Sequence, residues 1–262
     1  MEGVFLMKKV HINKRLVKMM AIGSLLICLL FWSSIGTAET LDKSKLDPLV
    51  EQEEQKVAYL TFDDGPSRNT IRILDILDEF GVKATFFVMA NDTPEGTVGY
   101  DEMIKRGHQI ALHTYSHDYR EIYTTKKDCF ENINRLETFL AERYNIRTNV
   151  LRFPGGSKNV SSRQYGGAHI MTEIKEECVR RGYRFFDWNV DSKDGISPYV
   201  SVHAITTNVL NGAKNKQQAI ILLHDINLMT NTVTALPIII KGLKEQGFVF
   251  SVINDKTEDM QF

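Results

Sequence analysis

The chain has 262 residues, of which 43% are hydrophobic, and carries 32 Lys and Arg against 33 Asp and Glu. This hydrophobic fraction is ordinary for a globular protein and allows the sizeable core of one large domain or two small ones. The near balance of charge argues against nucleic acid as a partner, because a nucleic-acid binder usually carries an excess of basic residues.

The N-terminal segment has the pattern of an export signal. Residues 1–38 hold five basic side chains and one acidic one, and their basic part is followed by a long apolar run that ends in small residues, Gly36 and Ala38. This order is typical of a secretory signal peptide, with a retained membrane anchor as the alternative. We therefore expect an exported protein, either secreted or tethered to the cell surface through this segment alone. Residues 39–56 are charged and predict a linker.

From residue 57 onward, short apolar runs alternate with segments of helical period. The predicted strands are residues 57–62, 84–89, 109–114, 150–154, 184–190, 219–225 and 248–253. The predicted helices are residues 69–80, 99–106, 124–144, 169–181, 200–213 and 232–246. Nearly continuous hydrophobic strands that alternate with helices indicate a parallel sheet covered on both faces. We expect one α/β domain over residues 57–262, a closed or nearly closed barrel of about seven parallel strands, with an open doubly wound sheet as the alternative.

Polar residues follow most of these strands. In α/β barrels the reactive groups gather at the carboxyl ends of the strands, so residues at those positions are candidates for a shared site. The candidates are Asp63, Asp64, His113, His117, Arg152, Asp191, His224 and Asp225.

The adjacent carboxylates Asp63 and Asp64 need an explanation, because two ionised neighbours repel unless a cation, a shared proton or water compensates them. His113 and His117 are four residues apart, a spacing that places two imidazoles on the same side of a helical turn. Two imidazoles and one carboxylate with open positions for water are the usual ligands of a hydrolytic zinc centre. We predict that Asp64, His113 and His117 bind a divalent cation; the alternative is that both histidines only form loop hydrogen bonds.

Asp63 would then be free to act as a base. A carboxylate beside a metal-activated water can accept its proton. Arg152 would keep Asp63 ionised and oriented, and the pair Gly155 and Gly156 would let a backbone N–H near Gly155 approach a developing oxyanion. The alternatives are a structural ion pair for the arginine and a simple turn for the glycines.

His224 is the candidate acid that protonates the leaving group. A neighbouring carboxylate would keep its imidazole protonated near neutral pH. We assign that carboxylate to Asp191, ahead of Asp225 and Asp194. The alternatives are a histidine satisfied by the backbone near a strand end, and a structural ion pair for Asp191.

Five segments in this order resemble the motifs of the polysaccharide deacetylase family, the NodB-homology domains of carbohydrate esterase family 4. They are TFDDGPS, HTYSH, RFPGGS, DSKDG and LLHD, and the resemblance covers about residues 57–253. It implies a distorted (β/α) barrel that binds a divalent metal, most often Zn²⁺ with Co²⁺ or another cation possible. It also implies hydrolysis of N-acetyl groups on N-acetylglucosamine units, commonly in the peptidoglycan of the cell wall for exported bacterial members.

The resemblance assigns roles to individual residues. It implies that Asp63 is the base, that His224 is the acid and that Leu222 forms an apolar wall of the acetyl pocket. Two positions depart from the family pattern, because Gly155 and Gly195 stand where an aromatic residue and a tryptophan are frequent. Both departures predict a less bulky groove wall and therefore a different glycan length or sugar.

Several alternatives remain open from the sequence. The same machinery would serve a chitooligosaccharide N-deacetylase or an O-acetyl xylan esterase. A non-catalytic glycan-binding protein is a third alternative, although such a protein is expected to have lost at least one reactive group. We expect a monomer, and the sequence leaves open whether Cys129 and Cys178 form a disulfide.

Overall fold

A parallel sheet organises residues 55–262, the part of the chain that the computed structural model describes. Its strands are β1 (Val57–Asp63), β2 (Thr85–Val88), β3 (Gln109–Leu112), β4 (Val150–Leu151), β5 (Arg184–Phe185), β6 (Val190–Asp191), β7 (Gln218–His224) and β8 (Val249–Phe250). The strand order is β5-β4-β3-β2-β1-β7-β6, and β8 pairs with β1. The sheet curls into an incomplete barrel, which confirms the expected distorted (β/α) barrel in a single domain.

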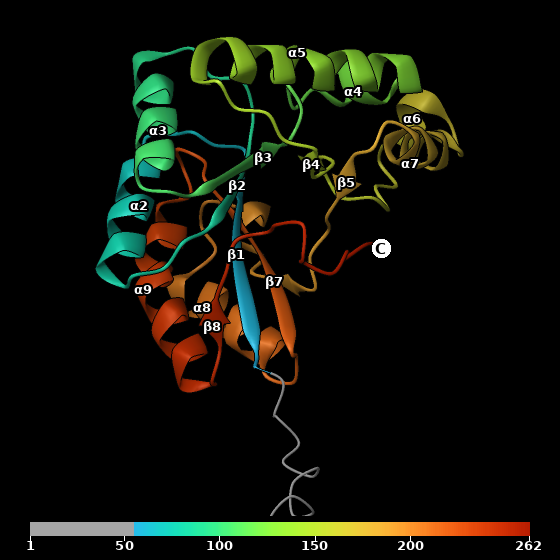
Figure 1. Cartoon of the computed structure of the whole chain (residues 1–262). Helices are drawn as coiled ribbons and strands as arrows, with labels where there is room; N and C mark the ends of the chain where they lie inside the picture. The colour runs from blue at the N-terminus through green and yellow to red at the C-terminus, as the bar shows by residue number, and fades with distance from the viewer. Residues whose placement is uncertain (1–54) are drawn as a thin grey trace, which may run out of the picture. The chain divides into compact units, whose positions relative to one another are not determined.

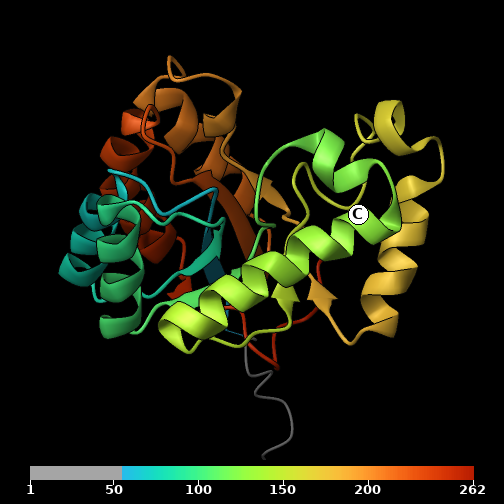
Figure 2. The ribbon, with the colours of Figure 1, turned by 90° about the horizontal axis from the view of Figure 1, so that it is seen from above.

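Helices surround this sheet (Figures 1 and 2). They are α2 (Thr70–Glu79), α3 (Pro94–Lys105), α4 (Tyr119–Tyr123), α5 (Lys126–Tyr144), α6 (Arg163–Gly166), α7 (Ile170–Arg180), α8 (Val202–Ala213), α9 (Thr230–Glu245) and the 3-10 helix η2 (Asp194–Ile196). Helix α5 shows how local sequence sets the boundaries, since the Thr125 side chain accepts a hydrogen bond from Asp128 N and the helix ends at Asn145 with φ 55°. Among residues 55–262, no helix combines the length and the apolar character needed to cross a bilayer.

The core has two parts. The larger part fills the space between the sheet and the helices. The smaller part lies inside the barrel and consists of Tyr59, Phe87, Ala111, Val150, Phe186, Ile220 and Ile253. Because side chains alternate along a strand, positions two or four residues further along these strands also face the interior. Alternation therefore brings Asp63, His113, Arg152 and His224 to the carboxyl end of the barrel.

One predicted strand is in fact two. Residues 184–190 form β5 and β6 with a break between them, and these two strands do not pair. The break has a physical cause, because the Arg152 guanidinium takes the carbonyls of Phe186 and Asp187 as hydrogen-bond acceptors at 2.9 and 3.0 Å. The last described residues lie at this break, where Asp187 N donates to Met260 O at 2.6 Å.

Cys129 and Cys178 are both buried, and neither forms a disulfide within the part of the chain that the structure describes. They lie on α5 and α7, and burial raises the pKa of the Cys178 thiol to about 12. The predicted signal peptide or anchor at residues 1–38, and all but the last two residues of the predicted linker at 39–56, lie outside the described residues.

Candidate active site

The ends of four parallel strands bring the candidate residues together. Asp63 at the end of β1 pairs in register with His224 at the end of β7. His113 directly follows β3, and Arg152 directly follows β4. All four side chains therefore lie at one end of the barrel.

A possible metal site is formed by Asp64, His113 and His117. One potential ligand atom from each residue lies within 4.8 Å of the others. Asp64 Oδ1 is 3.4 Å from His113 Nε2 and 3.7 Å from His117 Nε2. These are the three residues that the sequence analysis brought together.

Three observations show that this group fits a cation. Asp64 Oδ1 is buried and has no hydrogen-bond partner within residues 55–262. His113 Nδ1–H donates to Arg152 O at 2.8 Å, which leaves Nε2 as the ring nitrogen that faces Asp64. Burial opposes ionisation of Asp64, but the neighbouring His113 and His117 outweigh it and lower the pKa of this carboxyl to about 2. The site therefore offers an anionic oxygen and imidazole nitrogens without another partner for that oxygen.

The candidate base, Asp63, is held by a buried arginine. Arg152 Nη1 donates to Asp63 Oδ1 at 2.8 Å and to Thr61 Oγ1 at 2.7 Å. Arg152 is fully buried, and its guanidinium carbon lies 4.1 Å from the centroid of the Phe87 ring. The arginine therefore cannot rotate away without losing hydrogen bonds to β1 and to the backbone at the end of β5 and just after it. The sequence analysis missed Thr61, although its place two residues before Asp63 on one strand puts it on the same face.

The candidate acid, His224, pairs with Asp194 and not with Asp191. His224 Nδ1 lies 2.7 Å from Asp194 Oδ1, and His224 N donates to Asp194 Oδ2 at 2.8 Å. Burial opposes protonation of this imidazole, but the Asp194 hydrogen bond and the charges of Asp63 and Asp64 raise the pKa of His224 to about 9. The histidine is therefore protonated at neutral pH.

The assignment of Asp191 as this partner is wrong for a geometric reason. Asp191 pairs in register with Leu222, two residues before His224. Its carboxylate accepts hydrogen bonds from Lys193 N at 2.8 Å and Lys193 Nζ at 2.6 Å. Lys193 adopts a left-handed φ of 62°, and the resulting turn carries Asp194 inward, where Ser192 Oγ and Thr232 Oγ1 also donate to it. The sequence contained a signal for Asp194 as the partner of His224, since Asp194 directly precedes the position where the family often has tryptophan.

Asp225 has a structural position behind the first motif. Its fully buried carboxylate accepts hydrogen bonds from Ser67 Oγ at 2.6 Å and Thr70 Oγ1 at 2.5 Å. A Cβ atom at Gly65 would collide with this carboxylate. Burial raises the pKa of Asp225 to about 6. Asp225 therefore connects β7 to the turn that follows Asp63 and Asp64.

The two glycines that depart from the family pattern lie against other side chains. A Cβ at Gly155 would lie 2.5 Å from Tyr119 Oη, and a Cβ at Gly195 would lie 2.5 Å from His224 Cε1. The Tyr119 ring also lies 5.5 Å from the ring of the candidate metal ligand His117. Tyr119 and His224 therefore stand where a Cβ atom would lie at these positions, and the less bulky groove wall stays a prediction. Nothing in the sequence pattern marked Tyr119.

Two further predicted residues border this end of the barrel. Gly155 is exposed with φ 75°, and no hydrogen bond within residues 55–262 uses its N–H. Leu222 is 5% exposed and lies two residues before His224 on the same face of β7.

Asp187 was not among the residues predicted from the sequence. It fixes the glycine loop, because its carboxylate accepts hydrogen bonds from Ser157 N at 2.8 Å and from Ser157 Oγ at 2.5 Å.

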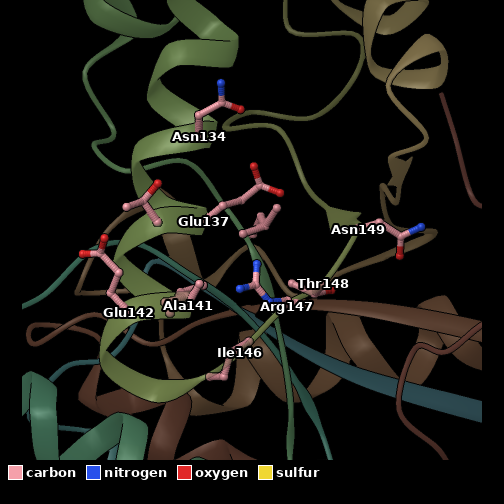
Figure 3. A pocket seen from close by; sticks show the side chains of 11 residues that line it. Asn134, Glu137, Ala141, Glu142, Ile146, Arg147, Thr148 and Asn149 are labelled. Atoms are coloured by element: carbon pink, nitrogen blue, oxygen red, sulfur yellow. The ribbon is translucent and has the colours of Figure 1, made fainter.

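A cavity of about 750 Å³ lies apart from the candidate active-site residues (Figure 3). It lies between α5 and the segment that enters β4, and its charged lining residues are Glu137, Glu142 and Arg147. None of the candidate catalytic or metal-binding residues lines it.

Similar proteins place the chain among the hydrolases that deacetylate glycans. A family profile described as polysaccharide deacetylase matches residues 51–174. A peptidoglycan-N-acetylglucosamine deacetylase of Bacillus cereus is 32% identical over 213 residues, which cover 78% of this chain and 71% of that protein. The chain belongs to the polysaccharide deacetylase family, whose members are generally metal-dependent.

Solved structures and more distant relatives agree with this assignment. The catalytic domain of a peptidoglycan N-acetylglucosamine deacetylase from Eubacterium rectale superimposes with a TM-score of 0.74 at 34% identity, covering 79% of this chain and 93% of that one. A bifunctional xylanase/deacetylase of Pseudobutyrivibrio xylanivorans is 32% identical over 208 residues, which cover 79% of this chain and 31% of that protein.

Proposed function

We propose that this polysaccharide deacetylase hydrolyses the N-acetyl groups of N-acetylglucosamine units in peptidoglycan and releases acetate. One observation carries the proposal: a carboxylate held by arginine, an Asp-His-His group and a protonated histidine meet at one end of the barrel. Metal-assisted amide hydrolysis uses such groups as a base for water, as ligands of a cation and as an acid for the departing amine.

The relatives support peptidoglycan as the substrate. A Bacillus cereus relative and the Eubacterium rectale structure both carry the name of peptidoglycan N-acetylglucosamine deacetylase. The basic and apolar segment at residues 1–38 fits an exported enzyme that meets the cell wall, either secreted or tethered. The xylanase/deacetylase relative keeps removal of O-acetyl groups from xylan as a second candidate.

Asp64, His113 and His117 would hold the metal, which we propose to be Zn²⁺. Neutral imidazole nitrogens and one carboxylate oxygen are a common zinc ligand set, although Co²⁺ or another divalent cation suits the same donors. When bound, such a cation polarises a carbonyl oxygen and makes water more acidic.

The protein side chains handle the protons. Asp63 accepts the proton of the attacking water, and Arg152 holds this carboxylate in place through a hydrogen bond of 2.8 Å. His224, protonated through its contact with Asp194, donates a proton to the nitrogen that leaves. The free N–H of Gly155 is available to the oxyanion, and Leu222 offers an apolar surface to the acetyl methyl group.

Acetate release tests this proposal. Protein freed of metal would be supplied with Zn²⁺, Co²⁺ or no metal and assayed on N-acetylglucosamine oligomers, purified peptidoglycan and acetylated xylan. We expect metal-dependent acetate from the first two substrates. Acetate only from xylan would replace the proposal with O-deacetylation, and a metal-loaded protein that binds glycan without releasing acetate would indicate a binding protein.

A further inference from the structure

A small basic pocket lies beside the loop that carries Gly155. Its volume is about 220 Å³, which is room for about seven water molecules and therefore for a side group but not for a disaccharide. Its charged lining residues are Lys158, Arg163 and Lys175, and no acidic residue lines it.

The three cations of this pocket lack anionic partners. Within residues 55–262, none of them forms an ion pair or donates a side-chain hydrogen bond. By contrast, Arg180 and Arg181 both form ion pairs with Glu177. They lie at the C-terminal end of α7, the helix that carries Lys175. The positive charge of the pocket is therefore not neutralised by neighbouring side chains and favours a bound anion.

The start of α7 adds to this positive potential. The pocket is lined by Ala168, Met171 and Thr172, which lie at the beginning of that helix. The residue before the helix, His169, makes no side-chain capping hydrogen bond. The positive end of a helix dipole favours anions, and residues at the start of α7 line the same pocket as the three cationic side chains.

Contacts link this pocket to the candidate active site. Ser157 lines the pocket and lies two residues after Gly155. From α6, the Tyr165 ring lies 6.4 Å from the Tyr119 ring, which in turn lies 5.5 Å from the ring of His117. The glycine loop and these ring contacts therefore connect the pocket with the His117 side of the candidate active site.

We propose that the pocket of Lys158, Arg163 and Lys175 binds a carboxylate of the substrate while an N-acetyl group occupies the catalytic residues. This inference rests on the proposed function and sharpens it, because it selects a glycan with acidic side groups over neutral chitin or xylan. The peptides attached to peptidoglycan carry such carboxylates. A charge-assisted hydrogen bond from arginine or lysine is a favoured way to bind them.

The first test compares two substrates in steady-state kinetics of the full chain. Replacing each basic residue by glutamine (Lys158→Gln, Arg163→Gln, Lys175→Gln) should lower kcat/KM on peptidoglycan about two- to fivefold through KM. The same variants should keep the wild-type rate on neutral N-acetylglucosamine oligomers. Lys214→Gln is the matched control, because Lys214 is exposed and lies outside the pocket. Equal losses on both substrates, or no loss, would overturn the proposal.

The second test measures binding and does not depend on turnover. Co-sedimentation would compare untreated peptidoglycan, peptidoglycan freed of phosphate-containing polymers, and the freed material after its carboxylates have been converted to amides. We expect amidation, but not phosphate removal, to weaken binding of the wild-type protein. After amidation, the wild type should bind no more tightly than the variant with all three substitutions (Lys158→Gln, Arg163→Gln and Lys175→Gln). The reverse result would identify phosphate as the anion and overturn the carboxylate assignment. Wild-type protein that discriminates by carboxylate without releasing acetate would refute the proposed function alone.

Discussion

The base and the acid of the site are built in different ways. Asp63 ends β1, and Arg152 directly follows β4. Arg152 is fully buried, and its guanidinium donates hydrogen bonds to the β1 side chains Thr61 and Asp63 and to the carbonyls of Phe186 and Asp187. His224 is 19% exposed in its side chain and receives its carboxylate from the turn after β6. The sheet therefore fixes the base, whereas a loop conformation fixes the acid.

Removal of the base should give the largest effect. We expect Asp63→Asn to lower kcat by about 10²- to 10⁴-fold, because an amide cannot accept the proton of water at neutral pH. Metal content, measured by elemental analysis, should stay near that of the wild type, since Asp64, His113 and His117 remain. His113→Ala is the matched comparison and should lose metal and activity together. An Asp63→Asn enzyme with wild-type kcat would refute the role of Asp63 as base.

Replacement of the carboxylate beside the acid should give a smaller effect with a pH signature. Asp194 raises the pKa of His224, so Asp194→Asn should lower that pKa and reduce the protonated fraction at neutral pH. We expect kcat to fall about 10- to 100-fold and the alkaline limb of the pH–rate profile to move to lower pH, measured with the same metal in both proteins.

Asp191→Asn provides the control for this comparison. Asp191 contacts Lys193 and not His224, so the variant should stay within about twofold of the wild-type rate and keep its pH profile. A shift of the alkaline limb in Asp191→Asn, with none in Asp194→Asn, would restore the pairing that the sequence analysis first assigned.

A smaller effect than that of Asp194→Asn is expected for the side chain that fills the space beside Gly155. Tyr119→Phe removes only the hydroxyl that would collide with a Cβ at that position, whereas Tyr119→Ala also removes the ring beside His117. We expect less than a threefold change in kcat/KM for Phe and about a tenfold loss for Ala, mainly in KM, if the ring contacts substrate. Equal kinetics for both variants would exclude such a contact.

The sequence was sufficient to predict those site residues whose positions follow from the alternation of side chains along a strand. Asp63, His113, Arg152 and His224 follow predicted strands, and strand alternation with parallel pairing is enough to bring them together. The partner of His224 could not be derived this way, since Asp194 is delivered by the left-handed conformation of Lys193. Tyr119 was missed for a related reason, because its contact with the Gly155 loop joins segments that are distant in sequence.

The break between β5 and β6 has a consequence for the order in which the site is completed. Asp187 binds Ser157 of the glycine loop, and the same carboxylate accepts a hydrogen bond from Phe262 N at 2.7 Å. Residues near 260 are synthesised after every strand of the barrel. During synthesis, the wall beside the glycine loop therefore gains its final contacts only after the rest of the domain has emerged, so a nascent chain lacks a fully assembled site.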